Sequence, residues 1–203
     1  STAPKAGGFA ALVSVLVIGL PQARATWMPV IVAIAALTMT LGNLLAIPQT
    51  NAKRLLAWSG VAQVGYVLLG LAAGTERGLA MLLFYLAGYA VTNAGAFLVA
   101  HAVAVSDGDE GVSGFDGLAK QSPWLALALL MFVLSLAGIP FAVGFWAKLY
   151  VFLAAWEAGL GWLVLAGAVL AIVALFDYLD MAKAAYVGAP RRPEPVVVSF
   201  PLK

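Results

Sequence analysis

Residues 135–140 read SLAGIP and lie in the middle of an apolar run of about 34 residues, 122–155. A straight helix of that length would exceed the bilayer core, which is about 30 Å thick and is crossed at about 1.5 Å per residue. Pro140 lacks an amide hydrogen and clashes with the preceding helical turn. We therefore predict two half-helices joined by an unwound stretch at Gly138 and Pro140, as recurs in membrane transporters. A simple proline kink is the alternative.

The rest of the chain is similarly apolar. Of its 203 residues, 64% are hydrophobic and 10% are charged, and the mean hydropathy is +1.01. Soluble domains are about 45–50% apolar and about 25% charged, so this composition excludes a water-soluble globule and a disordered chain. The net charge of +2, without a basic cluster, excludes a nucleic-acid binder. Without cysteine, and with a single histidine, no thiolate or histidine metal site is expected.

Six apolar runs can be traced, and none alternates with the period of two that a β-barrel strand requires. They cover residues 3–20, 27–47, 54–73, 78–105, 122–155 and 158–188. We predict an all-α, polytopic transmembrane helix bundle with about six spans, in which the span at about 122–155 is discontinuous. Residues 1–203 are expected to form a single membrane domain. Because the first residue is serine and an apolar run begins near residue 199, we expect both ends to be truncated.

The charged residues predict the orientation of the bundle. Seven lysines and arginines fall in or near the loops at 48–54 and 106–121 and the segment after 189, whereas the opposite side carries only Arg24 and Arg77. The positive-inside rule then predicts that the first three segments are cytoplasmic.

Two lysines lie within apolar runs and outside these loops. Lys5 is near the start of the first run, and Lys148 follows Pro140 by eight residues. A lysine at bilayer depth costs about 2.5–3.5 kcal/mol on insertion scales, and burial makes its charged form less favourable. A buried lysine that loads and releases a proton is suited to a proton relay. The alternative is that the ammonium groups snorkel to the interface.

Polar side chains also recur along the third and fourth runs at helical spacing, which predicts a hydrated, hydrogen-bonded axis. These side chains are Ser59, Gln63, Tyr66, Tyr85, Tyr89, Asn93 and His101. Ordinary bonding between helices is the alternative. In the last run, Asp177 and Asp180 lie three residues apart on one face, and we predict that Asp180 pairs with Lys183. The alternative is that both acids belong to an ion pathway.

Several stretches resemble one family of membrane proteins, in order along nearly the whole chain. They are GNL (42–44), QTNAKRLLAWS (49–59), FYLAGY (84–89), NAGAF (93–97), LSLAGIP (134–140), GF (144–145) and KLY (148–150). Together they resemble subunit N of bacterial NADH-quinone oxidoreductase, or respiratory complex I, which is one of its antiporter-like membrane subunits.

The resemblance implies that the chain corresponds to helices eight through thirteen of the family, within the second of two inverted five-helix repeats. Lys5 then matches the connecting lysine of helix eight, and Lys148 matches the terminal lysine of the broken helix twelve. The family often has a histidine within Ser-Ile-Ala-His-x-Gly-Tyr, where residues 60–66 here read GVAQVGY. Gln63 therefore replaces that histidine and carries no proton at neutral pH.

The predicted function is that of a proton-translocating, non-redox subunit of the NADH:quinone oxidoreductase, in the inner membrane of a bacterium. The resemblance implies partners in the other membrane-arm subunits. It places NADH, FMN, the iron–sulfur clusters and quinone in other subunits, with no cofactor in this chain. One alternative is a subunit of a multi-subunit sodium/proton antiporter. The other is a structural membrane-arm subunit that conducts no ions.

Overall fold

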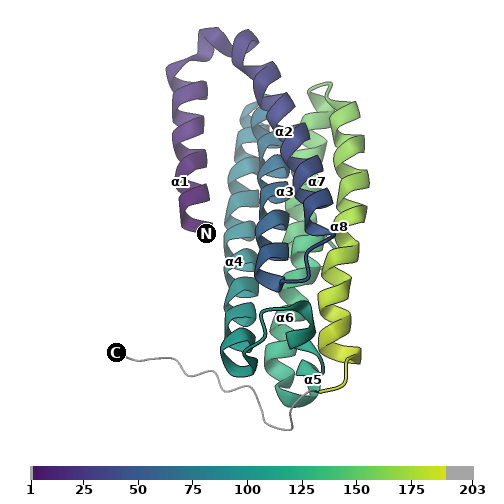
Figure 1. The fold of residues 1–203 in the computed structure, drawn as a ribbon. Coiled ribbons are helices and arrows are strands. Elements are labelled where there is room, and N and C mark those ends of the chain that lie inside the picture. Colours follow the sequence, from purple (N-terminus) through teal and green to yellow (C-terminus); the bar gives the residue numbers. More distant parts are fainter. Residues whose placement is uncertain (1, 191–203) are drawn as a thin grey trace, which may run out of the picture.

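The computed structural model describes residues 2–190, and almost all of this part is helical (Figure 1). The elements are α1 (Thr2–Val13), the π-helix η1 (Ser14–Gly19), the 3₁₀ turn η2 (Pro21–Ala23), α2 (Arg24–Ala46), α3 (Ala52–Ala73), α4 (Glu76–Asp107), the 3₁₀ turn η3 (Val112–Phe115), α5 (Leu118–Gln121), α6 (Pro123–Ala137), α7 (Val143–Glu157) and α8 (Gly161–Val187). The predicted all-α bundle is confirmed. The prediction treated 106–121 as a plain loop, but this segment contains η3 and α5.

Each predicted apolar run corresponds to one rod of the bundle. Four of the described helices are long and apolar enough to cross a membrane: the rod formed by η2 and α2, and the helices α3, α4 and α8. The run at 3–20 forms α1 and η1. The run at 122–155 is divided into α6 and α7, which continue in the same direction along the bundle in Figure 1. The predicted discontinuous helix is therefore confirmed.

The boundaries of α3 and α4 follow from capping side chains in the sequence. The side chain of Asn51 accepts a hydrogen bond from the Arg54 amide at 3.0 Å, and that of Thr75 accepts from the Gly78 amide at 3.0 Å. Both are N-cap contacts that satisfy an otherwise unpaired helical amide. Helix α3 ends at Gly74, whose φ of 62° is readily adopted only by residues without a Cβ.

Helix α3 is the centre of the bundle and is buried along most of its length, whereas α2, α4 and α8 are buried along less than half of their crossing segments. Small residues allow its neighbours to approach closely. A Cβ on Gly42 of α2 would lie only 2.3 Å from the backbone nitrogen of Ala62 on α3. Close backbone contact at glycine is a common basis for packing between membrane helices.

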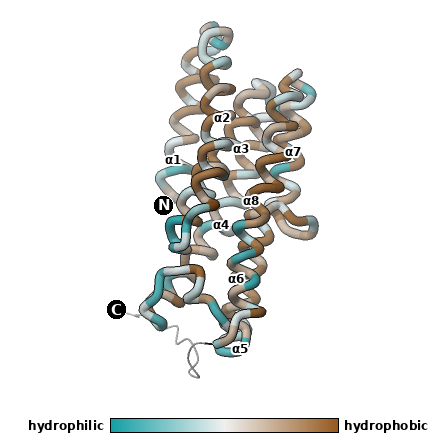
Figure 2. The backbone as a smooth tube through the Cα atoms, turned by 45° about the vertical axis from the view of Figure 1, so that its right-hand side comes forward, coloured by the Kyte–Doolittle hydropathy of each residue, from teal (hydrophilic) through white to brown (hydrophobic). Residues whose placement is uncertain are grey.

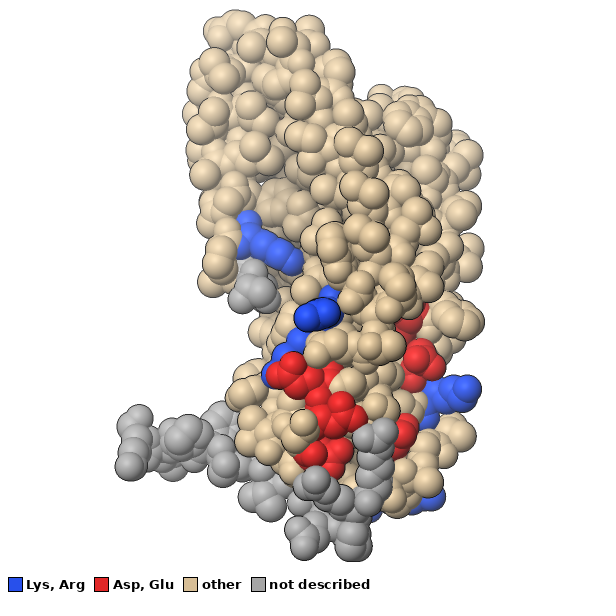
Figure 3. All heavy atoms as spheres, in the orientation of Figure 1, with Lys and Arg blue, Asp and Glu red and all other residues tan. Residues whose placement is uncertain are grey.

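The outer surface of the bundle is apolar. Leu98 on α4, and Ile172 and Phe176 on α8, are mostly exposed. Brown, hydrophobic stretches cover the rods in Figure 2, and the charged side chains in Figure 3 gather toward the lower end of the face shown. Apolar surface on this scale is unfavourable in water and matches a lipid environment. The chain is therefore a multi-pass membrane protein.

The segments predicted to share one side of the membrane do meet at one end of the bundle, as far as residue 190. Asn51 and Gly111 form an antiparallel β-bridge, which we call the loop bridge. The Lys53 ammonium lies 2.8 Å from a carboxylate oxygen of Glu110, and this neighbour holds the pKa of the Glu110 carboxyl below its usual value. The amide of Gly117 donates to the carbonyl of Ala184 at 3.1 Å, so the 106–121 loop also contacts α8.

Candidate functional site

The break between α6 and α7 leaves two backbone carbonyls without helical donors. In a continuous helix the carbonyls of Leu136 and Ala137 would accept from the amides of residues 140 and 141. Pro140 has no amide hydrogen. Phe141 leaves the helical path with a φ of 83°. Both carbonyls therefore point out of the C-terminus of α6, where the helix dipole gives a partial negative charge.

Lys148 on α7 occupies this carbonyl pair. Its Nζ donates to the carbonyl of Leu136 at 2.7 Å and to that of Ala137 at 2.9 Å, and the residue is 5% exposed. The ammonium also lies 5.1 Å from the ring centre of Tyr66, within cation–π range. No carboxylate among the described residues pairs with it. The predicted burial of Lys148 beside the broken helix is what the structure shows.

Two glycines give the break its close geometry. A Cβ on Gly138 would lie 3.0 Å from Cδ of Lys148, so a larger residue would press on the lysine stem. A Cβ on Gly144 would lie 1.8 Å from the carbonyl oxygen of Ser135, and the Gly144 amide donates to the Ser135 hydroxyl at 3.1 Å. The first turn of α7 therefore packs directly against the last turn of α6.

Gln63 on α3 shares a carbonyl with Lys148. Its Nε2 donates to the carbonyl of Leu136 at 2.9 Å and to the hydroxyl of Tyr178 at 3.3 Å, and its Oε1 accepts from the hydroxyl of Tyr85. The residue is buried. Gln63 thus links α3, α4, α8 and the end of α6 at one point beside the lysine.

Lys5 on α1 lies on the other side of α3 and α4. Its Nζ donates to the carbonyl of Gly60 at 3.0 Å and to the hydroxyl of Tyr89 at 2.8 Å. A Cβ on Gly60 would come within 2.6 Å of that Nζ, so the glycine makes room for the lysine. Like Lys148, Lys5 has no carboxylate partner within residues 2–190.

A small cavity separates the two lysine sites. It measures about 10 Å³, and its lining includes Gln63, Tyr85, Tyr89 and Leu136. A cavity of this size admits about one water molecule, provided that polar groups surround it. The polar groups between Lys5 and Lys148 therefore run from Tyr89 across this cavity to Tyr85 and Gln63, and then to the carbonyl of Leu136.

The remaining axis residues are placed as follows. Ser59 and Tyr66 are buried on α3, and Asn93 is buried on α4 one turn from Tyr89. The structure does not bring His101 into this group, because its side chain is exposed on α4. Tyr178 was not among the predicted site residues, although a tyrosine within the apolar run at 158–188 is the same kind of signal that identified Tyr66.

The predicted ion pair between Asp180 and Lys183 is wrong. In the described part of the chain, the ion pairs are Lys53 with Glu110, and Arg77 with Glu157. Asp180 instead lines a cavity at the end of the bundle, as described below. Spacing by three residues places two side chains on one helix face, but each can still turn to a different neighbour. Within residues 2–190, no three His, Cys, Asp or Glu side chains come together as a metal site would require.

These features define a helical membrane protein with two lysines inside the bundle, a half-buried one on α1 and a buried one held at a broken helix. The chain belongs to the transmembrane family described as NADH:quinone oxidoreductase/Mrp antiporter, which matches residues 1–174. It is 42% identical over 204 residues to NADH-quinone oxidoreductase subunit N of Heliobacterium modesticaldum, an alignment that covers 100% of this chain and 43% of that protein.

Solved structures show the same fold. A chain of the Mrp complex from Dietzia sp. DQ12-45-1b is 34% identical with a TM-score of 0.77, over 81% of this chain and 31% of that one. A chain of respiratory complex I from Thermus thermophilus with bound NADH is 26% identical with a TM-score of 0.80, over 88% of this chain and 38% of that one. The chain thus spans less than half the length of these relatives.

Proposed function

We propose that the protein containing this chain is a non-redox membrane subunit of an NADH-quinone oxidoreductase, and that it moves protons across the membrane when NADH reduces quinone. NADH, FMN, the iron–sulfur clusters and quinone bind to partner subunits in this proposal. The loops at 48–54 and 106–121 and the segment after 189 face the cytoplasm. The family of the chain, and its relative named subunit N, support the assignment to an NADH-quinone oxidoreductase.

The observation that carries the proposal is the environment of Lys148. A lysine paired with a carboxylate would be held in its charged form. Lys148 is instead held by the carbonyls of Leu136 and Ala137. These carbonyl dipoles favour the ammonium, but a neutral amine still has two hydrogens to donate to them. The side chain can therefore lose and regain a proton without losing its position.

Lys5 gives the second half of the mechanism. It too is held by neutral acceptors, the carbonyl of Gly60 and the hydroxyl of Tyr89. Because no described carboxylate neutralises either lysine, a charge on Lys5 repels a charge on Lys148 through a poorly screening interior. Loading of Lys5 then favours release of the proton from Lys148.

The test is NADH-driven proton uptake into inverted membrane vesicles that carry the full-length protein with Lys148→Ala. Lys120→Ala, an exposed lysine on α5, is the matched control. NADH oxidation with an artificial acceptor reports whether the complex assembles. We expect the assembled Lys148→Ala complex to lose proton uptake and the Lys120→Ala control to keep it. Full uptake would refute the relay, and failed assembly would favour a structural role for the lysine.

The second candidate is a subunit of a multi-subunit sodium/proton antiporter. The likeness to the Mrp complex chain, at 34% identity, is the observation that favours it. This candidate predicts sodium-dependent proton exchange that does not require NADH. Vesicles assayed with and without sodium, in the presence and absence of NADH, separate the two functions.

A further inference from the structure

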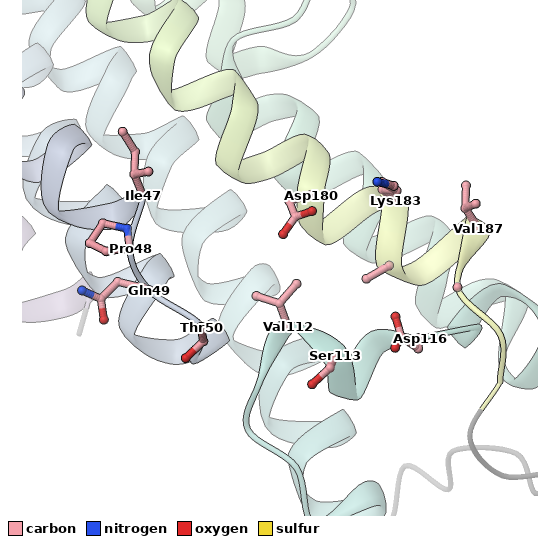
Figure 4. Close-up of a pocket in the computed structure, with 12 residues that line it drawn as sticks. Ile47, Pro48, Gln49, Thr50, Val112, Ser113, Asp116, Asp180, Lys183 and Val187 are labelled. Carbon is pink, nitrogen blue, oxygen red and sulfur yellow. The ribbon is translucent and has the colours of Figure 1, made fainter.

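A polar cavity opens at the end of the bundle where the loops at 48–54 and 106–121 meet the last turns of α8. It has a volume of about 550 Å³ and lies between the end of α2, the 106–121 loop and the last turns of α8 (Figure 4). Thr50, Ser113, Asp116, Asp180 and Lys183 contribute polar groups to its lining. In Figure 4 the carboxyl of Asp180 points from α8 toward the loop that carries Val112. A cavity of this size and polarity holds many water molecules.

Asp177 lies one turn deeper on the same face of α8. Residues 180, 184 and 187 line the cavity. Residue 177 precedes them by three, seven and ten positions, which is the spacing of one helix face. Asp177 is 6% exposed and forms no hydrogen bond or ion pair with any residue from 2 to 190. A carboxyl without a partner within a membrane-spanning helix is costly when charged, and the lysine relay does not use it.

The next residue of α8, Tyr178, is hydrogen-bonded to Gln63 beside the lysine site. The hydroxyl of Tyr178 accepts from Nε2 of Gln63, which also donates to the carbonyl of Leu136, and Nζ of Lys148 donates to the same carbonyl. Gln63 therefore links the Tyr178 hydroxyl to the carbonyl oxygen that holds Lys148. Tyr178 thus ties the helix that borders the cavity to the broken helix.

We propose that the cavity at Asp180, together with the buried carboxyl of Asp177, is the aqueous entry through which Lys148 exchanges its proton. A proton enters from water at Asp180 and is taken up by the Asp177 carboxylate. It then passes by way of the Tyr178 hydroxyl and intervening water to the neutral amine of Lys148, and Asp177 returns to the carboxylate. Gln63 holds Tyr178 beside the lysine without itself gaining or losing a proton.

The ligand of this entry is water and its excess proton, and a metal cation is the competing occupant. Two carboxylates three residues apart on one helix face attract any cation. Lys183 at the mouth of the cavity opposes the entry of a metal ion. If the effect of the Asp177 variants on proton uptake depended on sodium, the assignment of this entry to protons would therefore be contradicted.

The entry rests on the proposed function, and its test uses the full-length protein in its complex. Asp177→Asn keeps the shape of the side chain but cannot carry a proton, and Asp177→Glu restores the carboxyl. Glu157→Gln at the opposite end of the bundle is the matched control, since its pair with Arg77 is exposed. We expect Asp177→Asn to lose most of the proton uptake per NADH oxidised, and the other two variants to retain it.

The outcomes separate this entry from the proposed function. Normal uptake in Asp177→Asn together with lost uptake in Lys148→Ala overturns the entry and leaves the lysine relay standing. Normal uptake in both variants overturns the lysine relay, and the entry with it. If Asp177→Asn does not assemble, Ala184→Cys in a cysteine-free background is labelled with a membrane-impermeant maleimide, with lipid-facing Ile172→Cys as the control. Labelling of residue 184 alone supports the entry, and equal protection of both residues overturns it.

Discussion

Gly144→Ala tests the contact between the two half-helices. A Cβ at this position would lie 1.8 Å from the carbonyl oxygen of Ser135, which belongs to the backbone and cannot rotate away. The half-helices would have to separate by roughly 1.5 Å before the contact became tolerable. Lys148 lies four residues further along α7 and would move with it, away from the carbonyls of Leu136 and Ala137.

The expected loss of stability can be worked from three contributions. Forcing a methyl group into a packed interface costs about 1–3 kcal/mol. Weakening the hydrogen bond from the Gly144 amide to the Ser135 hydroxyl, 3.1 Å long, costs about 1 kcal/mol more. The better helix propensity of alanine returns at most about 1 kcal/mol. The net destabilisation is about 1–3 kcal/mol, enough to lower the thermal stability of the subunit.

The assay compares thermal inactivation of the solubilised complex and NADH-driven proton uptake in vesicles. Gly8→Ala is the control, because no atom lies within 4 Å of the added methyl group. We expect Gly144→Ala to inactivate at a lower temperature and to take up fewer protons per NADH, with Gly8→Ala unchanged. If Gly144→Ala behaves like the wild type in both measurements, the direct packing of α7 on α6 is wrong.

Three further predictions follow from the other contacts. Gly60→Ala is expected to lower proton uptake, because the added methyl group would lie 2.6 Å from the Lys5 Nζ and 2.8 Å from the Tyr89 hydroxyl and would disrupt the hydrogen bond between them; unchanged uptake would contradict a role for that contact. Gln63→Leu leaves two buried tyrosine hydroxyls without their amide partner and is expected to cost about 1–3 kcal/mol, measured as earlier thermal inactivation; unchanged inactivation would contradict the hydrogen-bond network. The Lys53 ammonium lowers the pKa of Glu110, so this pair stabilises the loop bridge above the unfolded pKa of about 4.3 and stops doing so as the pH falls through the lower folded value. Hydrogen exchange of the loop-bridge amides, corrected for the intrinsic effect of pH, should speed up there, and constant protection would refute the role of the pair.

The sequence was sufficient to predict most of the fold. Apolar runs of span length, divided by Gly74 and Pro48, locate the helices to within a few residues, since a bilayer allows few other structures. The length of the run at 122–155 and the position of Pro140 predicted the break. The short helices within 106–121 were missed because they are set by contacts with α8 and the loop bridge, which no local pattern encodes.

The site was only partly predictable. The cost of burying a charge identified Lys5 and Lys148 from sequence, but three of the four groups that accept their hydrogen bonds are backbone carbonyls, which leave no mark in residue identity. The supposed pair of Asp180 with Lys183 was wrong because helical spacing alone does not say where each side chain points. His101 lies on the same helix as Tyr89 and Asn93, yet its side chain faces outward, although Ala100 and Val103 beside it are buried.

Gln63 lies between the two lysine sites. Its Oε1 accepts from Tyr85, which lines the small cavity together with Tyr89, the partner of Lys5. Its Nε2 donates to the Leu136 carbonyl, which holds Lys148. A side-chain amide accepts at one end and donates at the other, so it aligns the dipoles on both sides. Because an amide does not ionise near neutral pH, Gln63 itself neither gains nor loses a proton. Gln63 therefore couples the two lysine sites through aligned hydrogen-bond dipoles and not through a proton of its own.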